Sequence, residues 1–165
     1  MQPAGGAAMS SEAAFHTLGN KELLELHKVA FLCSRNCPAA VVRRSLDWAI
    51  SQREKGICVI SGFHSRIEKE VLHHLLKGTQ PIVVALAKGI SKGLDPQLQA
   101  PLAAGRLLIV SRYADSVTHA CEDKCFHRNR LMLELADETV IAYASSGGNL
   151  ERLCRECPGA KLSVL

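Results

Sequence analysis

Small hydroxyl residues, glycines and cations recur at five points of the chain, each directly after a short apolar run. These points are Cys33-Ser34-Arg35-Asn36, Ser61 to Arg66, Lys88-Gly89, Ser111-Arg112-Tyr113 and Ser145 to Asn149. Glycine lets backbone amides approach a ligand closely, and the start of a following helix adds partial positive charge. Together with the arginines and lysines, these groups are typical of a site for phosphate oxygens.

The segment Phe126-His127-Arg128-Asn129-Arg130 is the sharpest local feature. Its two arginines fall in the first turns of a predicted helix, where a cation opposes the helix dipole at a cost of about 0.3–1 kcal/mol each. An anionic ligand nearby would offset that cost. The alternative is that both arginines are solvated, or pair with acidic residues such as Glu122, Asp123 and Glu134.

The apolar runs that precede these turns predict buried strands. They are rich in β-branched residues and do not alternate with polar residues, as expected for strands covered on both faces. The runs are Val29–Cys33, Ile57–Ile60, Ile82–Ala87, Leu107–Val110, Thr139–Tyr143 and Leu162–Leu165.

The segments between the runs predict helices. A helix from Pro38 to Gly56 carries the stripe Val42, Leu46, Ala49 and Ile50. The other helices are expected at Arg66–Lys77, Pro96–Ala104, Lys124–Ala136 and Asn149–Glu156, with a short one at Lys21–Leu26 that Asn20 caps.

Strands alternating with helices predict an α/β fold: a doubly wound, mostly parallel, Rossmann-like sheet in three α/β/α layers. We expect one domain over residues 20–165, after a mobile tail over residues 1–19. Ligands of such folds bind at the carboxyl ends of the strands, so the five turns should share one edge. Neither G-x-G-x-x-G nor a Walker motif is present, which disfavours a nicotinamide-dependent dehydrogenase and a P-loop NTPase.

Composition limits the kind of partner. The 165 residues carry 20 Lys and Arg against 16 Asp and Glu, a mild positive charge that permits an anionic ligand. Aromatic residues make up only 4%, which argues against a platform for base stacking. Apolar runs are too short to cross a membrane. Seven cysteines without a secretory signal indicate reduced thiols in the cytoplasm.

Two cysteine pairs could bind zinc. Cys121 and Cys125 lie near His119 and His127, and Cys154 and Cys157 form a C-x-x-C pair. We favour scattered free thiols and expect neither a metal nor a cofactor. His64 lies in a predicted ligand turn and could contact phosphate or move a proton, or it could be an ordinary loop residue.

In their order, these turns resemble the DNA-processing protein A (DprA/Smf) family of the SLOG, lysine-decarboxylase-like superfamily. The family's G-S-R turn looks like Cys33-Ser34-Arg35, its S-G-x-A-x-G-I-D loop like Ser61 to Glu68, its R-N-R segment like Arg128 to Arg130, and its Ser-Gly turn like Ser146 to Leu150. In the second loop, His64 and Arg66 replace a small residue and a glycine, and Glu68 replaces an aspartate.

The resemblance implies a Rossmann-like domain that binds single-stranded DNA, or another nucleotide-type phosphate ligand, and forms a homodimer. Asn129 would brace the arginine loop. The binding residues that the turns and the resemblance together predict are Ser34, Arg35, Ser61, Gly62, His64, Arg66, Arg128, Asn129, Arg130, Ser146, Gly147 and Gly148.

The alternative is an enzyme of the same superfamily, a phosphoribohydrolase of the cytokinin-activating type that acts on nucleoside monophosphates. Those enzymes carry the motif P-G-G-x-G-T-x-x-E, and Gly147 to Glu151 matches only part of it. We therefore favour a binding protein over an enzyme.

Overall fold

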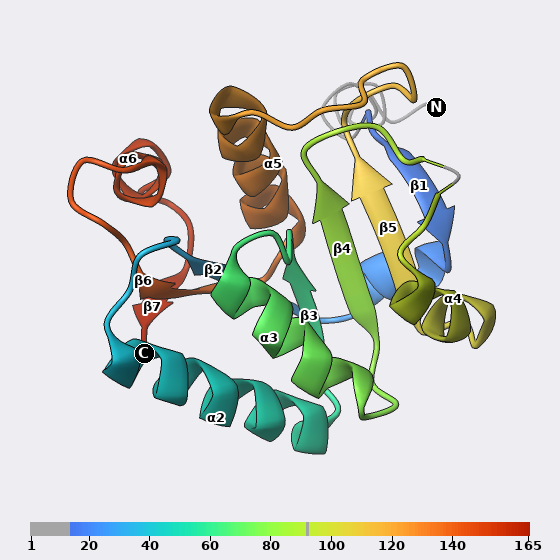
Figure 1. Ribbon diagram of the computed structural model, residues 1–165, viewed down its shortest axis with the longest axis horizontal. Coiled ribbons are helices and arrows are strands. Elements are labelled where there is room, and N and C mark those ends of the chain that lie inside the picture. The colour runs from blue at the N-terminus through green and yellow to red at the C-terminus, as the bar shows by residue number, and fades with distance from the viewer. Residues whose placement is uncertain (1–13, 92) are drawn as a thin grey trace, which may run out of the picture.

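The computed structural model describes residues 14–91 and 93–165, which contain a single mixed sheet (Figure 1). The strands lie in the order β1-β5-β4-β3-β2-β6-β7. All neighbours are parallel except β1, which pairs antiparallel with β5. The strands are β1 (His16–Gly19), β2 (Lys28–Cys33), β3 (Cys58–Ser61), β4 (Ile82–Leu86), β5 (Leu107–Ser111), β6 (Glu138–Tyr143) and β7 (Leu162–Val164).

Helices cover both faces of this sheet, and each face has its own apolar core (Figure 1). Residues of α2, α3 and α4 pack on one face, and residues of η1, α5 and α6 pack on the other. Among the described residues, none of these helices is both long and apolar enough to cross a membrane. The helices are η1 (Lys21–Glu25), α2 (Ala39–Lys55), α3 (Arg66–Leu76), α4 (Pro96–Ala103), α5 (Glu122–Leu135) and α6 (Asn149–Glu156).

The strands form where the sequence predicts them because both of their faces are apolar. In β2, Phe31 belongs to one core, and its neighbours Ala30 and Leu32 belong to the other. Such a strand can be buried only between two helical layers. The doubly wound, Rossmann-like prediction is confirmed.

The domain begins earlier than predicted. His16–Gly19 were expected in the tail, but they form β1 and extend the sheet beyond β5, with Thr17 opposite Val110. Asn20 then caps η1 by accepting a hydrogen bond from the Glu22 amide, as predicted, although the helix is 3-10. The remainder of the expected tail, residues 1–13, lies outside the described residues.

The predicted apolar stripe of α2 is correct only in part: Ala49 is buried and Val42 packs against the core, but Leu46 and Ile50 belong to neither core. The buried residues of this helix are Val41, Ser45, Ala49 and Gln52. The reason is that α2 packs both on the sheet and along α3. Small and polar residues such as Ser45 and Gln52 therefore occupy much of its buried face. The bulkier Val42 and Trp48 pack at its sides, where Trp48 stacks on Phe31.

The strand order reverses between β2 and β6, which are parallel neighbours. From β2, successive strands run outwards to β5 on one side, whereas β6 and β7 lie on the other. At this switch point, the Ser145 amide donates to Ser34 Oγ over 2.9 Å, and the Ser34 amide donates to the Tyr143 carbonyl over 2.8 Å. Ligands of doubly wound folds bind in the crevice formed at such a reversal.

Candidate functional site

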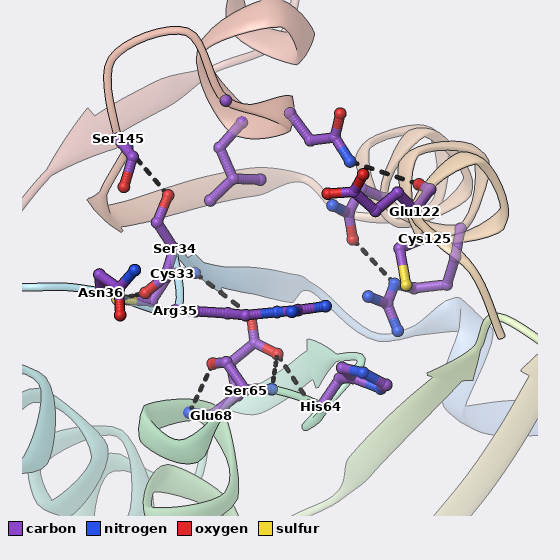
Figure 2. Close-up of a pocket in the computed structure, with 15 residues that line it drawn as sticks. Cys33, Ser34, Arg35, Asn36, His64, Ser65, Glu68, Glu122, Cys125 and Ser145 are labelled. Carbon is purple, nitrogen blue, oxygen red and sulfur yellow. Dashed lines mark hydrogen bonds between the residues drawn. The ribbon is translucent and has the colours of Figure 1, made fainter.

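A cavity of about 230 Å³ opens at the carboxyl ends of β2 and β6, as the switch point predicts (Figure 2). Its walls come from the turns after β2, β3 and β6 and from the first turns of α5 and α6. The residues that line it are Cys33, Ser34, Arg35, Asn36, His64, Ser65, Glu68, Glu122, Cys125, Arg128, Asn129, Ser145, Gly148, Asn149 and Leu150.

Arg128 is the buried cation of this cavity, with 6% of its surface exposed. Its Nε donates to Asn129 Oδ1 over 2.8 Å, and its Nη1 makes a longer hydrogen bond of 3.4 Å to the Ala85 carbonyl. The guanidinium lies over Gly62, where an added Cβ would collide with it. The cation is therefore held at the floor of the cavity by its neighbours, and Asn129 braces it.

Glu68 joins two of the turns. Its Oε1 accepts hydrogen bonds from the His64 and Ser65 amides, at 2.9 and 3.2 Å, and its Oε2 accepts one from the Cys33 amide at 3.2 Å. Figure 2 shows this carboxylate between the turn after β2 and the start of α3. Ser65 and Glu68 also form a capping box, so the N-terminus of α3 has its amides satisfied by the protein itself.

Two other helix N-termini at the cavity remain open. The N-cap residues of α5 and α6 are Cys121 and Gly148, and neither makes a side-chain capping hydrogen bond. Unsatisfied amides and the helix dipole together favour an anion at such ends. The groups that can attract an anion are thus Arg128 and these two helix ends, and Glu122 is the acidic side chain of the lining beside them.

His64 lies within reach of the charges of two guanidinium groups, those of Arg128 and Arg35. Its pKa lies below the ordinary value of 6.5, first because of partial burial and then because of the charge of Arg128, with a smaller contribution from Arg35. The imidazole is therefore neutral at pH 7. In Figure 2, Arg35 extends across the cavity above Glu68, on the side of the cavity where His64 lies.

The structure brings half of the predicted binding residues together in the cavity lining: Ser34, Arg35, His64, Arg128, Asn129 and Gly148. Gly62 lies directly beneath Arg128. Ser61 is fully buried behind the site, where its hydroxyl donates to the Phe31 carbonyl and accepts from the Phe63 amide. Its role is thus to hold the turn.

Arg66, Arg130, Ser146 and Gly147 do not line this cavity. Arg130 points to α6 and pairs with Glu156 at 3.6 Å, a partner that the sequence did not indicate. The Gly147 amide donates to Glu151 Oε1 over 2.9 Å. Both groups are therefore engaged with α6.

The twelve predicted binding residues did not include Glu68 or Ser145, which are both parts of the site. Glu68 was noted only for its departure from the family's aspartate, although the spacing Ser65-x-x-Glu68 is the signature of a capping box. Ser145 belongs to the predicted turn Ser145 to Asn149, but no local signal indicates its hydrogen bond to Ser34, which lies 111 residues away.

The two cysteine pairs do not assemble a metal centre in the described part of the chain. No group of three or more histidine, cysteine, aspartate or glutamate side chains is arranged there to hold a metal ion. The four cysteines of these pairs are free thiols.

The profile of the family DNA recombination-mediator protein A matches residues 9–152, which is most of the chain. The chain belongs to this family. The match includes every turn of the cavity described above. No curated protein sequence matches the chain.

Solved structures agree on the fold. DNA processing protein A of Helicobacter pylori superposes with a TM-score of 0.71 at 18% identity over 91% of this chain, and that protein has a single-stranded DNA binding mode. The Streptococcus pneumoniae protein gives the same TM-score at 21% identity, also over 91% of this chain. The match spans 70% of the Helicobacter chain and only 54% of the Streptococcus chain.

Proposed function

We propose that this member of the family binds single-stranded DNA through backbone phosphates in the cavity at the switch point. The observation that carries the proposal is the buried Arg128 guanidinium facing a cavity that two uncapped helix N-termini border. A phosphate there would accept from the guanidinium and from the open amides, both of which bind anions strongly.

Ser34 and Ser145, which lie at the switch point between β2 and β6, support the same ligand. Ser34 Oγ accepts from the Ser145 amide, which leaves its hydroxyl hydrogen free to donate into the cavity. Arg35 lines the same cavity and is exposed, so it can reach a second phosphate along a strand. Except for His64, the lining has no aromatic ring, so binding through phosphates explains the site better than base stacking.

The test is fluorescence anisotropy with a labelled oligothymidylate at rising salt. We expect the logarithm of affinity to fall by about 0.7 per phosphate contact for each tenfold rise in salt. Arg128→Ala should weaken binding at least about tenfold, because a charged hydrogen bond contributes about 1.5–3 kcal/mol. The matched control removes two exposed arginines of α2, Arg43→Ala with Arg44→Ala. Equal affinity of the Arg128 variant and this control would refute the proposal.

A free mononucleotide is a second ligand of the same chemistry. The phosphoribohydrolase alternative has less support, because Glu151 is held by the Gly147 amide and does not line the cavity. The carboxylate that lies deepest in the cavity wall, Glu68, is committed to three amides. Incubation with AMP should therefore release no free adenine.

We also propose that two copies pair along the outer edge of β7. This strand ends the sheet on the β6 side, and Val164 on it is 77% exposed. Light scattering should give twice the monomer mass, and Val164→Asp should reduce it. A monomeric wild-type protein would contradict the pairing.

The thiols fit a reducing compartment, and we place the protein in the cytoplasm on that basis. All seven cysteines are free. Burial raises the pKa of Cys58 to about 12, so its thiol stays protonated and resists oxidation.

A further inference from the structure

A second cavity lies on the opposite face of the sheet from α5, between α3 and α4. Its volume is about 430 Å³, within the range of about 300–1,000 Å³ that small-molecule sites occupy. It shares no lining residue with the cavity at the switch point. The two cavities are nevertheless neighbours, because Gly62, which lines the second one, lies directly beneath Arg128 of the first.

The hollow exists because α3 and α4 diverge. α3 packs along α2, whereas the short α4 packs on β5 and contains Pro101 within it. Figure 1 shows β4 and β5 between the two helices. Val84 and Ile109 of these strands line the cavity. Its walls are mostly apolar side chains, with Ser91 and Gln97 as polar ones; the apolar residues are Phe63, Leu72, Leu86, Ile90, Leu94 and Leu98.

Two cations stand at the rim of this apolar hollow. Lys69 and Lys88 line it and are both exposed, and neither makes an ion pair within the described residues. The acidic side chain at the rim, Asp95, is used as the N-cap of α4, where it accepts from the Gln97 amide and side chain. The rim therefore carries two cations against one carboxylate, and the interior is mostly apolar.

We propose that this cavity is a binding site for a small amphipathic anion. Such a ligand has an apolar body, aliphatic or aromatic, and one carboxylate, sulfonate or phosphate group. The body would displace water from the leucine walls, which is favourable in proportion to the apolar area covered. The anionic group would lie between Lys69 and Lys88 at the mouth.

The experiment uses the full chain with methyl-labelled leucine and isoleucine, titrated by NMR with two probes. Octanoate and naphthalene-2-sulfonate represent the aliphatic and aromatic sources of this chemistry, and octanol and naphthalene are their uncharged counterparts. We expect saturable shifts at the methyl groups of Leu72, Leu94 and Leu98 with at least one anion. The probe that binds more tightly identifies the source.

Variants separate charge from volume. Lys69→Ala with Lys88→Ala should weaken binding of the anion about three- to tenfold, as expected for two exposed ion pairs, and leave the uncharged counterpart unchanged. Lys55→Ala with Lys77→Ala removes two exposed lysines outside the lining and should change nothing. Leu94→Trp fills the hollow and should abolish the methyl shifts.

The Lys69 and Lys88 variant still tests the proposal if Leu94→Trp does not fold, because exposed lysines are dispensable for folding. No saturable shift with either anion would overturn the proposal, and so would shifts that map elsewhere or unchanged affinity in the Lys69 and Lys88 variant. Oligothymidylate binding should be the same in all of these variants, so this site and the proposed DNA site fail or succeed separately.

Discussion

The guanidinium of Arg128 occupies the space in which a side chain at position 62 would begin, so Gly62 and Arg128 form one structural unit. Arg128 lies on α5, and Gly62 lies in the turn directly after β3, at the edge of the sheet that carries the cavity. Glycine at position 62 is therefore explained by close approach, since its backbone does not adopt a positive φ.

Gly62→Ala should displace Arg128 and weaken oligonucleotide binding about as much as Arg128→Ala does. Adding Gly62→Ala to Arg128→Ala should cost little more, because the side chain with which the new methyl group collides is then gone. Anisotropy and urea unfolding of both single variants and the double variant measure this coupling. Gly159→Ala is the control, because an added Cβ there meets nothing. Additive effects of the two substitutions would contradict the relationship.

Glu68→Gln should lower the free energy of unfolding by about 1–3 kcal/mol. Both carboxylate oxygens accept from backbone amides, so the amide group of glutamine must turn its own N–H toward one of these donors and leave it unsatisfied. Urea unfolding measures the loss. Glu70→Gln on the same helix is the control, and it should unfold like wild type. Equal stability of the two variants would mean that Glu68 does not hold the turns together.

The two arginines of the R-N-R segment should differ in their effects. Arg128→Ala removes the buried cation of the cavity, whereas Arg130→Ala removes an exposed partner of Glu156. We expect Arg130→Ala to weaken oligonucleotide binding no more than about threefold and to change stability by less than about 1 kcal/mol, as is usual for exposed ion pairs. A loss in Arg130→Ala as large as that in Arg128→Ala would place the ligand along α5 and α6 instead of in the cavity.

Oligonucleotide affinity should rise as the pH falls through the pKa that His64 has in the complex. Burial and Arg128 keep the pKa of the free imidazole below 6.5, and a phosphate beside it would favour the protonated form and raise that pKa. The gain should level off below the pKa of the free protein. NMR titration of the His64 ring, with and without oligonucleotide, measures both values. His64→Gln should remove this pH dependence of the affinity. Identical His64 titration curves with and without oligonucleotide would place the phosphate away from His64.

The strands, their order and the edge that carries the site could be predicted because these features repeat along the chain. Buried strands such as β2 have apolar residues on both faces, and parallel strands bring their carboxyl ends to one edge. Ser34, Arg35 and His64 follow such ends, and the structure collects them in one cavity.

The directions of individual side chains could not be predicted in the same way. Arg128 and Arg130 look equivalent in the sequence, yet a helix turns by about 200° between residues that are two apart. One arginine therefore faces the sheet and the other faces Glu156 on α6. The amides of the Ser61 loop also looked available, but Glu68 and Ser61 consume them within the fold.

The amides fixed by Glu68 have a consequence for how a polymer would lie in the cavity. With those groups already committed and no flat ring other than His64 in the lining, little in the site distinguishes one base from another. Successive nucleotides present identical phosphates, so a bound strand could advance by one unit and find the same environment. Such a site would hold any sequence equally well and let it slide.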